Sequence, residues 1–374
     1  MSKQSFASLG VSNAVVEALS KAGISEPFPI QSRVLPDALA GHDLLVRSPT
    51  GSGKSLAFGV PMVDLIEATD RRSAALILVP TRELASQIVE AVRGIAHARA
   101  LSIAAVYGGA GIERQSNLAR KAHILVATPG RLEDLLGRGA ITLAHVKLLV
   151  LDEADRMLDM GFKPAVDRIV KQCASQRQTM LFSATLDQAV EKLAKAYTTN
   201  PRRHEETRTQ EQRGEIEHRF LAVNHTAKLD TLVRELRDVR GGRTLVFVRT
   251  KRGADRLVKR LRAQDVTADA MHGDKTQGQR EKALRRFTTG ETTTLIATDV
   301  AARGLDVDGI THVINFDAPG AREDYVHRIG RTGRAGATGV GITFVVADQA
   351  RDVHKIAREL DLSDEFAASG LHVR

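Results

Sequence analysis

The sequence predicts an α/β protein made of two consecutive domains, each built on a doubly wound parallel sheet. Three observations support this fold class. The chain has 374 residues, more than a single hydrophobic core usually accommodates. Short runs rich in β-branched residues alternate with amphipathic stretches throughout, as expected of parallel strands joined by helices. A polar segment, residues 200–214, separates the two halves.

The predicted strands are short apolar runs, and the stretches between them have helical periodicity, for example 187–197 and 251–261. Each half of the chain contains enough of these runs to form its own sheet. The predicted strands are 43–46, 75–79, 102–106, 124–127, 148–151 and 180–183, then 219–223, 244–248, 267–271, 294–297, 312–315 and 342–345.

The polar segment has the sequence "NPRRHEETRTQEQRG" and is nearly free of apolar side chains. It cannot contribute an element to a hydrophobic core, so it is typical of a linker. We therefore expect an N-terminal segment (1–33), a first domain (34–204), a linker (205–214) and a second domain (215–374).

Composition narrows the class of protein. Apolar residues make up 43% and charged residues 26% of the chain, which is ordinary for a globular protein. The net charge of +9 suits a polyanionic partner without identifying it. The single cysteine, Cys173, excludes an internal disulfide, fits a reducing cytosol and is predicted at the end of a surface helix. No run approaches the roughly 18–20 apolar residues that cross a bilayer, so we expect a cytoplasmic protein.

The segment "SPTGSGKS" follows an apolar strand and precedes a helix predicted from Leu56, the context of a phosphate-binding loop. Glycines let the backbone N–H groups approach phosphate oxygens. Lys54 would neutralise the β- and γ-phosphates of ATP, and the hydroxyl of Ser55 would bind Mg²⁺. Ser48 replaces the usual first glycine, so a simple Gly/Ser turn is the alternative. The candidate loop residues are Ser48, Pro49, Thr50, Gly51, Ser52, Gly53, Lys54 and Ser55.

A second candidate, "VLDEAD", also follows a predicted strand, and parallel sheets bind ligands at the carboxyl ends of their strands. Asp152 would hold Mg²⁺ through water, and Glu153 would orient and deprotonate the attacking water. An acidic helix N-terminus is the structural alternative.

Together these two segments resemble the DEAD-box RNA helicase family, and the resemblance extends from Phe6 to about Val346. It is closest to the short bacterial members. It implies two RecA-like domains, ATP and Mg²⁺ as cofactors, and RNA as the partner. We expect a monomer, and proteins of ribosome assembly or RNA decay remain open as further partners.

The resemblance gives the N-terminal segment the role of reading adenine, with Gln31 of "PFPIQ" as the reader. A carboxamide can pair with adenine N6 and N7, as it does in DNA recognition. Phe6 matches an isolated upstream aromatic of the family, although it could also be a helix staple. Ile24 stands where the family usually has an aromatic, which implies weaker stacking on the base.

Three further segments of the first half, "PTREL", "GG" and "TPGR", follow predicted strands. Each alone could be a helix cap with Pro in the first turn. As a set in the family's order, they imply contacts with the RNA backbone. The implied contacts are Pro80, Thr81, Arg82, Gly109, Thr128 and Arg131.

The tripeptide "SAT" implies coupling between hydrolysis and unwinding through hydroxyl bonds from Ser183 and Thr185 to Asp155. A helix N-cap at Thr185 would explain the same residues.

In the second half, "HRIGRTGRAG" interleaves three glycines with three arginines, which a basic amphipathic helix does not explain. The resemblance implies that Arg331 and Arg334 reach the γ-phosphate, for which the rigid fork of arginine is suited. It assigns Gly304 and Asp306 to the nucleotide, with Asp306 on the ribose. The implied RNA contacts here are Thr250, Gly273, Thr298 and Arg303.

The resulting hypothesis is an ATP-dependent RNA helicase that opens short duplexes locally, or displaces proteins from RNA, without processive movement. ATP and RNA together would favour a closed state in which both domains contribute to hydrolysis. Two alternatives stay open: an ATP-gated RNA clamp that binds without productive unwinding, and a DNA translocase on the same two-domain plan. Turnover, strand displacement and the choice between RNA and DNA would separate the three.

Overall fold

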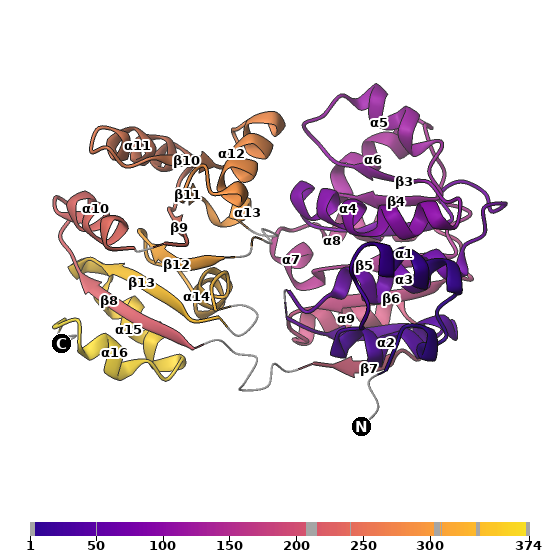
Figure 1. The fold of residues 1–374 in the computed structure, drawn as a ribbon, viewed down its shortest axis with the longest axis horizontal. Helices are drawn as coiled ribbons and strands as arrows, with labels where there is room; N and C mark the ends of the chain where they lie inside the picture. Colours follow the sequence, from indigo (N-terminus) through magenta and orange to yellow (C-terminus); the bar gives the residue numbers. More distant parts are fainter. Residues whose placement is uncertain are drawn as a thin grey trace. The chain divides into compact units, whose positions relative to one another are not determined.

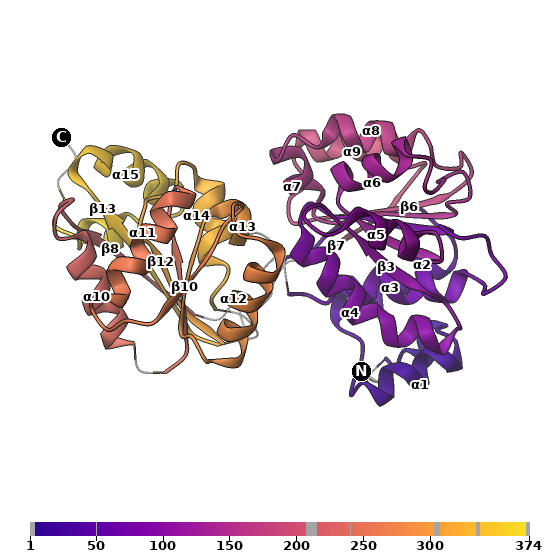
Figure 2. The same cartoon turned by 90° about the horizontal axis from the view of Figure 1, so that it is seen from above.

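The computed structural model describes residues 4–49, 51–206, 215–239, 241–302, 307, 309–333 and 337–371. The chain forms two compact units, Met1–Thr207 and Arg208–Arg374. Each unit has a central sheet with helices on both faces (Figures 1 and 2). This arrangement confirms the predicted α/β class with two parallel sheets.

The described residues of the first unit form a seven-stranded sheet in which every neighbouring pair is parallel. Its strands are β1 (Leu44–Arg47), β2 (Ala75–Leu78), β3 (Ile103–Val106), β4 (Ile124–Ala127), β5 (Leu148–Leu151), β6 (Gln178–Ser183) and β7 (Arg202–Glu205). The order across the sheet is β3-β4-β2-β5-β6-β1-β7. The first six strands are those predicted from the sequence.

Two apolar clusters cover the two faces of this sheet. Successive strand residues point to opposite faces, so Leu44 and Val46 join one cluster while Leu45 joins the other. The helices that supply the covering side chains include α1 to α4 on the first face and α6 to α9 on the second. The helices of this unit are η1 (Ala7–Leu9), α1 (Asn13–Lys21), α2 (Pro29–Leu39), α3 (Lys54–Leu65), α4 (Arg82–Ala98), α5 (Ile112–Ala119), α6 (Pro129–Gly137), α7 (Ala154–Asp159), α8 (Lys163–Val170) and α9 (Gln188–Tyr197).

Part of the polar segment 200–214 is a strand. β7 lies within this segment and pairs in parallel with β1, from Leu44↔Arg202 to Arg47↔Glu205. Its side chains are mostly exposed, which is why the segment lacks the apolar pattern of a strand. An edge strand can be held by backbone hydrogen bonds without a buried face. Residues 202–206 therefore belong to the first unit, and residues 207–214 lie outside the described part of the chain.

Cys173 also differs from the prediction. It is buried in the apolar cluster beneath α8, where its Sγ lies 3.6 Å from the carbonyl oxygen of Ile169. Burial raises the pKa of this thiol to about 11, so the thiol is protonated at neutral pH and is a poor nucleophile.

The second unit repeats the plan with a six-stranded sheet, again with parallel neighbours throughout. Its strands are β8 (Ile216–Ala222), β9 (Arg243–Phe247), β10 (Ala268–Met271), β11 (Thr294–Ala297), β12 (Ile310–Asn315) and β13 (Gly339–Val345). The order is β10-β11-β9-β12-β13-β8, so β10 and β8 are the edges. All six of these strands were predicted.

Helices of the second unit also divide between the two faces, with α10 and α11 on one cluster and α12, α14, α15 and α16 on the other. No helix within the described ranges has both the length and the apolar character to cross a membrane. The helices are α10 (Lys228–Asp238), α11 (Lys251–Arg262), α12 (Gln277–Thr289), α13 (Asp299–Ala302), α14 (Arg322–Ile329), η3 (Ala347–Gln349), α15 (Ala350–Glu359) and α16 (Ser363–Ala367).

Candidate functional sites on the two units

The strand order of the first unit sorts the candidate segments into two neighbouring groups. Each segment follows a strand, and parallel strands place all their carboxyl ends at one edge of the sheet. "GG", "TPGR" and "PTREL" follow β3, β4 and β2, which are adjacent. "DEAD", "SAT" and the phosphate loop follow β5, β6 and β1, which are adjacent in turn. The implied RNA residues and the implied ATP residues therefore occupy two halves of the same edge.

The phosphate loop begins directly after β1 and ends in the first turn of α3, a helix that starts two residues earlier than predicted. Gly51 and Gly53 have φ of 81° and 86°, a left-handed conformation that glycine adopts without steric cost. Lys54 is buried, and its Nζ donates a hydrogen bond to the carbonyl oxygen of Ser48 at 3.1 Å. The Ser48 hydroxyl bonds to Ser52 Oγ at 2.6 Å. The loop is thus ordered by its own polar groups.

Gln31 is buried against this loop. Its Nε2 donates to the carbonyl oxygen of Gly53 at 2.9 Å, and its Oε1 accepts from the backbone N–H of Phe28 at 2.9 Å. A carboxamide has two N–H groups and two lone pairs, so one of each remains for a ligand. The packing is tight, because a Cβ at Gly53 would lie 2.6 Å from Gln31 Nε2 and closer still to the ring of Phe28.

Phe28 is a residue that the sequence analysis missed. The residue is 56% exposed, although its ring lies against Gly53 and its backbone bonds to Gln31. Ile24 is half-buried and packs on the apolar core instead. Phe6 is buried in the core beside α1 and α2, a position that fits the staple alternative, and its role at the nucleotide stays a prediction.

Asp152 follows β5 and is buried, with its Oδ1 accepting from the backbone N–H of Glu153 at 2.9 Å. Burial raises the pKa of Asp152 to about 6, although the nearby charge of Lys54 acts in the opposite direction. A metal cation bound beside Asp152, in addition to the charge of Lys54, would stabilise the ionised form of the Asp152 carboxylate.

Glu153 is 4% exposed and has φ of 54°, an uncommon conformation for a residue other than glycine and one often found at functional sites. Its Oε2 accepts a hydrogen bond from Arg156 Nη1 at 3.0 Å, and Arg156 is itself buried. The sequence analysis gave Arg156 no role. This ion pair gives the buried Glu153 carboxylate a hydrogen-bonded partner and fixes its orientation.

Asp155 joins the "DEAD" segment to the end of β6. Its Oδ2 accepts from the backbone N–H groups of Ala184 and Thr185 at 3.1 and 3.2 Å and lies 3.4 Å from Thr185 Oγ1. The predicted contact through Thr185 is present. The Ser183 hydroxyl differs from expectation, because it accepts from the backbone N–H of Asp155 at 3.3 Å and does not bond to the carboxylate.

Two of the implied RNA residues, Arg82 and Arg131, meet at the loop after β3. Arg131 Nη1 donates to the carbonyl oxygen of Ala110 and to Gln115 Oε1, both at 2.9 Å. The Arg82 guanidinium lies against Gly109, where a Cβ would overlap with Nη1. Thr81 caps α4 by accepting from the Leu84 N–H at 3.3 Å, and Pro80 precedes it. Thr128 is the N-cap residue of α6.

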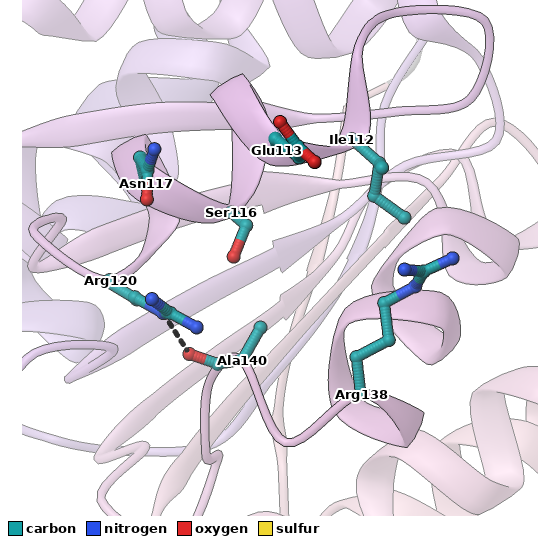
Figure 3. A pocket seen from close by; sticks show the side chains of 7 residues that line it. All are labelled: Ile112, Glu113, Ser116, Asn117, Arg120, Arg138 and Ala140. Carbon is teal, nitrogen blue, oxygen red and sulfur yellow. Dashed lines mark hydrogen bonds between the residues drawn. The ribbon is translucent and has the colours of Figure 1, made fainter.

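A pocket of ≈ 360 Å³ lies beyond this loop, between α5 and the turn after α6 (Figure 3). Arg120 and Arg138 lie on opposite sides of it, and Arg120 Nε donates to the carbonyl oxygen of Ala140 at 3.1 Å. None of the candidate residues lines this pocket, so it has no part in the predicted site.

In the second unit, Gly273, Thr298 and Thr250 follow β10, β11 and β9, which are adjacent at one side of the sheet. Thr250 caps α11 by accepting from the Gly253 N–H at 3.0 Å. The candidates Arg303, Gly304, Asp306 and Arg334, like Thr50 of the first unit, lie outside the described residues.

The arginines of the "HRIGRTGRAG" segment differ in their surroundings. Arg328 donates to both carboxylate oxygens of Asp299 at 2.6 and 2.7 Å, and also to the carbonyl oxygen of Asp317. It therefore fixes the start of α13, a structural role that the sequence did not indicate. Arg331 is 3% exposed, and its Nε donates to the carbonyl oxygen of His327 at 3.3 Å.

Two family models match this chain. The DEAD/DEAH box helicase model matches residues 28–193, and the helicase conserved C-terminal domain model matches residues 227–336. Among curated proteins, the DEAD-box ATP-dependent RNA helicase CshA of Geobacillus kaustophilus is 41% identical over 354 residues, which cover 94% of this chain and 76% of the relative. CshA of Bacillus subtilis is 41% identical over 342 residues, covering 91% and 69%.

Two solved structures are also similar to this chain over most of its length. Dbp5 of S. cerevisiae bound to RNA and ADP BeF3 is 29% identical with a TM-score of 0.86, covering 96% of this chain and 94% of that one. A DEAD box protein from the hyperthermophile Methanococcus jannaschii is 36% identical with a TM-score of 0.55, covering 96% and 97%.

Proposed function

This chain belongs to the family of DEAD-box ATP-dependent RNA helicases, and on that premise we propose that its ATP hydrolysis is stimulated by RNA and coupled to local, non-processive opening of short duplexes or to displacement of proteins from RNA. The observation that carries the proposal is the strand order of the first unit. It sets the ATP segments beside the RNA segments on one sheet edge, with Asp155 bonded to the "SAT" segment within the ATP half.

The phosphate loop binds ATP through its backbone N–H groups, and Lys54 exchanges its bond to Ser48 for the β- and γ-phosphates. Ser55 and Asp152 fit a magnesium ion that is shared with the phosphates. Among the described residues, no group of three His, Cys, Asp or Glu could hold a metal alone, and Mg²⁺ typically takes one or two protein carboxylates plus phosphate oxygens. Mg²⁺ held by these residues would neutralise charge that develops on the phosphates.

Glu153 orients the attacking water and accepts its proton. Arg156 supports this role because its guanidinium, 3.0 Å from the carboxylate, holds the Glu153 side chain in place. In the second unit, Arg331 and Arg334 supply positive charge to the γ-phosphate during turnover, and Gly304 and Asp306 contact the nucleotide.

Gln31 reads adenine with the N–H and lone pair that its bonds to Gly53 and Phe28 leave over. The exposed ring of Phe28 provides the apolar face for the base, whereas Ile24 is half-buried and packs on the core. Offset stacking on such a ring is favourable beyond the area it buries.

RNA lies along the loops after β3, β4 and β2, with Arg82 and Arg131 near its phosphates and the N-termini of α4 and α6 directed at the backbone. Thr250, Gly273, Thr298 and Arg303 extend these contacts on the second unit. Contacts with the ribose 2′-hydroxyl would distinguish RNA from DNA.

The test is the rate of ATP hydrolysis with single-stranded RNA, duplex RNA, matched DNA and no nucleic acid, together with strand displacement. Glu153→Gln should retain ATP and RNA binding but lose turnover by at least about a hundredfold, the usual contribution of a general base. ATP-dependent RNA binding with negligible turnover in the unmodified chain would favour the clamp. Stimulation by DNA and none by RNA would favour the translocase.

A further inference from the structure

A groove of ≈ 540 Å³ runs over the edge of the second sheet. Its floor is the edge strand β10, and its two walls are α11, from one face of the sheet, and α12, from the other. Both views show β10 between these helices (Figures 1 and 2). The basic residues that line it are Lys259, Arg262, Lys275, Lys282 and Arg286.

The segment of chain that forms the groove carries a large share of the protein's positive charge. Residues 251–291, which include both walls and the floor, contain eleven Lys and Arg against six Asp and Glu. Their net charge is +5, whereas the whole chain has +9. A concave surface lined by one sign of charge attracts an oppositely charged ligand more strongly than scattered charges do.

The two carboxylates of the groove are already neutralised. Asp269 accepts from Arg286 Nη1 at 2.9 and 3.0 Å and lies 3.8 Å from Arg262. Asp255 lies 2.8 Å from Lys275 Nζ. Among the residues that the structure describes, Lys259 on α11 and Lys282 on α12 line the same groove without a side-chain partner. Their charges are available to a ligand.

The groove is continuous with the RNA residues of the second unit. Lys275 lies two residues beyond Gly273, at the carboxyl end of β10, and Asp269 marks the other end of the groove near the start of that strand. A strand of four residues extends about 13 Å. At about 3.4 Å per phosphate along a stacked strand, this length accommodates roughly three or four phosphates.

We propose that this groove, with Lys259 and Lys282 on its two walls, holds the backbone of RNA that flanks the segment bound at the loops after β9, β10 and β11. The proposal rests on the proposed function and extends the RNA path beyond the sheet edge, down the side of β10. The contact is made to phosphates and is therefore independent of sequence. Flanking RNA would tether the enzyme beside the duplex that it opens.

An acidic peptide is the competing occupant, and the fold favours it less. A peptide that adds to a sheet edge gains most of its affinity from main-chain hydrogen bonds, and β10 offers only four residues. Phosphates need no such partner and are matched by lysines on flexible stems.

The experiment compares RNA affinity across a series of oligonucleotides from about 4 to about 20 nucleotides, lengths that span typical single-strand sites. The variant is Lys259→Ala/Lys282→Ala in the full chain. It should bind the longest RNA about tenfold more weakly at low salt, and its slope of log affinity against log salt should fall by about 1.4, or 0.7 for each lost phosphate contact. The shortest RNA should bind as it does to the unmodified chain.

Matched controls separate the groove from general electrostatics. Lys355→Ala/Arg358→Ala removes two exposed cations from α15 of the same unit, a helix that packs against α14 and α16. This variant should change neither the affinity for the longest RNA nor the slope of log affinity against log salt. Lys259→Arg/Lys282→Arg should restore the length dependence. Equal losses for short and long RNA, or no loss at any length, would overturn the proposal. A further outcome is that the unmodified chain binds polyglutamate. If the double alanine variant loses that binding and keeps its RNA affinity, the groove is a binding site for an acidic peptide and not for RNA.

Failure of the proposed function would look different. In that case the unmodified chain would hydrolyse ATP no faster with any RNA, short or long. Suppose that the shortest oligonucleotide stimulates turnover and that the double alanine variant keeps the length dependence of the unmodified chain. The proposed helicase function would then stand, and only the proposal for the groove would fail.

Discussion

The carboxyl group of Asp152 is 2% exposed, and burial raises its pKa from 3.8 to about 6 despite the charge of Lys54. A carboxyl group with a higher pKa in the folded state holds its proton more tightly there. Folding stability therefore falls as the pH rises from about 4 to about 6 and stays lower above that range. Asp152→Asn, which cannot ionise, should be more stable than the unmodified chain at pH 7 by roughly 1–3 kcal/mol, with no difference near pH 4. Denaturant unfolding of both proteins at the two pH values measures this, and equal stability at pH 7 would contradict it.

A second prediction at the residue scale concerns the proposed stacking of Phe28 on the adenine base of ATP. Phe28→Ala should raise the KM for ATP about tenfold with little change in kcat, because stacking of a base on an aromatic ring is worth about 1–3 kcal/mol. Phe28→Tyr should preserve the affinity. Leu118→Ala is a matched control, since Leu118 is also an exposed apolar residue but lies on α5, away from the phosphate loop. An unchanged KM in Phe28→Ala would remove the ring from the nucleotide site.

At the scale of elements, the loop between β3 and α5 tests the RNA half of the first unit. Gly109 has φ of 83°, and an added Cβ would lie 2.9 Å from Arg82 Cζ. Gly109→Ala should therefore displace the Arg82 guanidinium and weaken RNA binding about tenfold, a loss of one charge-assisted contact. Gly111 in the same loop has φ of −57°, and a Cβ added there would meet no described atom within 4 Å, so Gly111→Ala should bind RNA normally. RNA titrations of the two variants at one salt concentration provide the measurement.

The elements also show what the sequence can and cannot predict. All six strands of the second unit were found from short apolar runs. The inner strands β9, β11, β12 and β13 give the clearest runs, because a parallel strand that is buried on both faces is nearly continuous in apolar residues. β7 was missed, since the run from Arg202 to Glu205 is mostly exposed and is held by its pairing with β1. The order of strands is equally invisible in local patterns, and yet it is the order that separates the ATP segments from the RNA segments.

The same distinction applies to side chains. Glycines and lysines of a phosphate loop can be predicted because their spacing along the chain is fixed by the ligand. Arg156 could have been suggested by its i, i+3 spacing from Glu153, but only burial of both groups makes the pair important. Phe28 and Lys282 carry no local pattern. The roles that we propose for them rest on the residues that lie next to them in space.

At the scale of the whole molecule, the proposal requires ATP and RNA to favour the same state of the protein. If ATP raises RNA affinity by some factor, RNA must raise ATP affinity by the same factor, because the coupling free energy is shared. We expect this factor to be roughly 5–150, the common range. Binding of RNA with and without a non-hydrolysable ATP analogue, and the converse titration, measures it from both sides.

Arg331 then provides the decisive variant. It belongs to the second unit, whereas the phosphate loop belongs to the first, so Arg331→Ala should lower both coupling factors equally while RNA affinity without nucleotide stays unchanged. Turnover with RNA should fall about a thousandfold, as for other arginines that contact a transferred phosphate. Arg331→Lys should recover little, because lysine lacks the planar fork that pairs with two phosphate oxygens. Since Arg331 is buried, thermal unfolding of each variant must accompany the titrations. A coupling factor near one in the unmodified chain would contradict the shared state of the two units, and unchanged turnover with RNA in Arg331→Ala would exclude the arginine from hydrolysis.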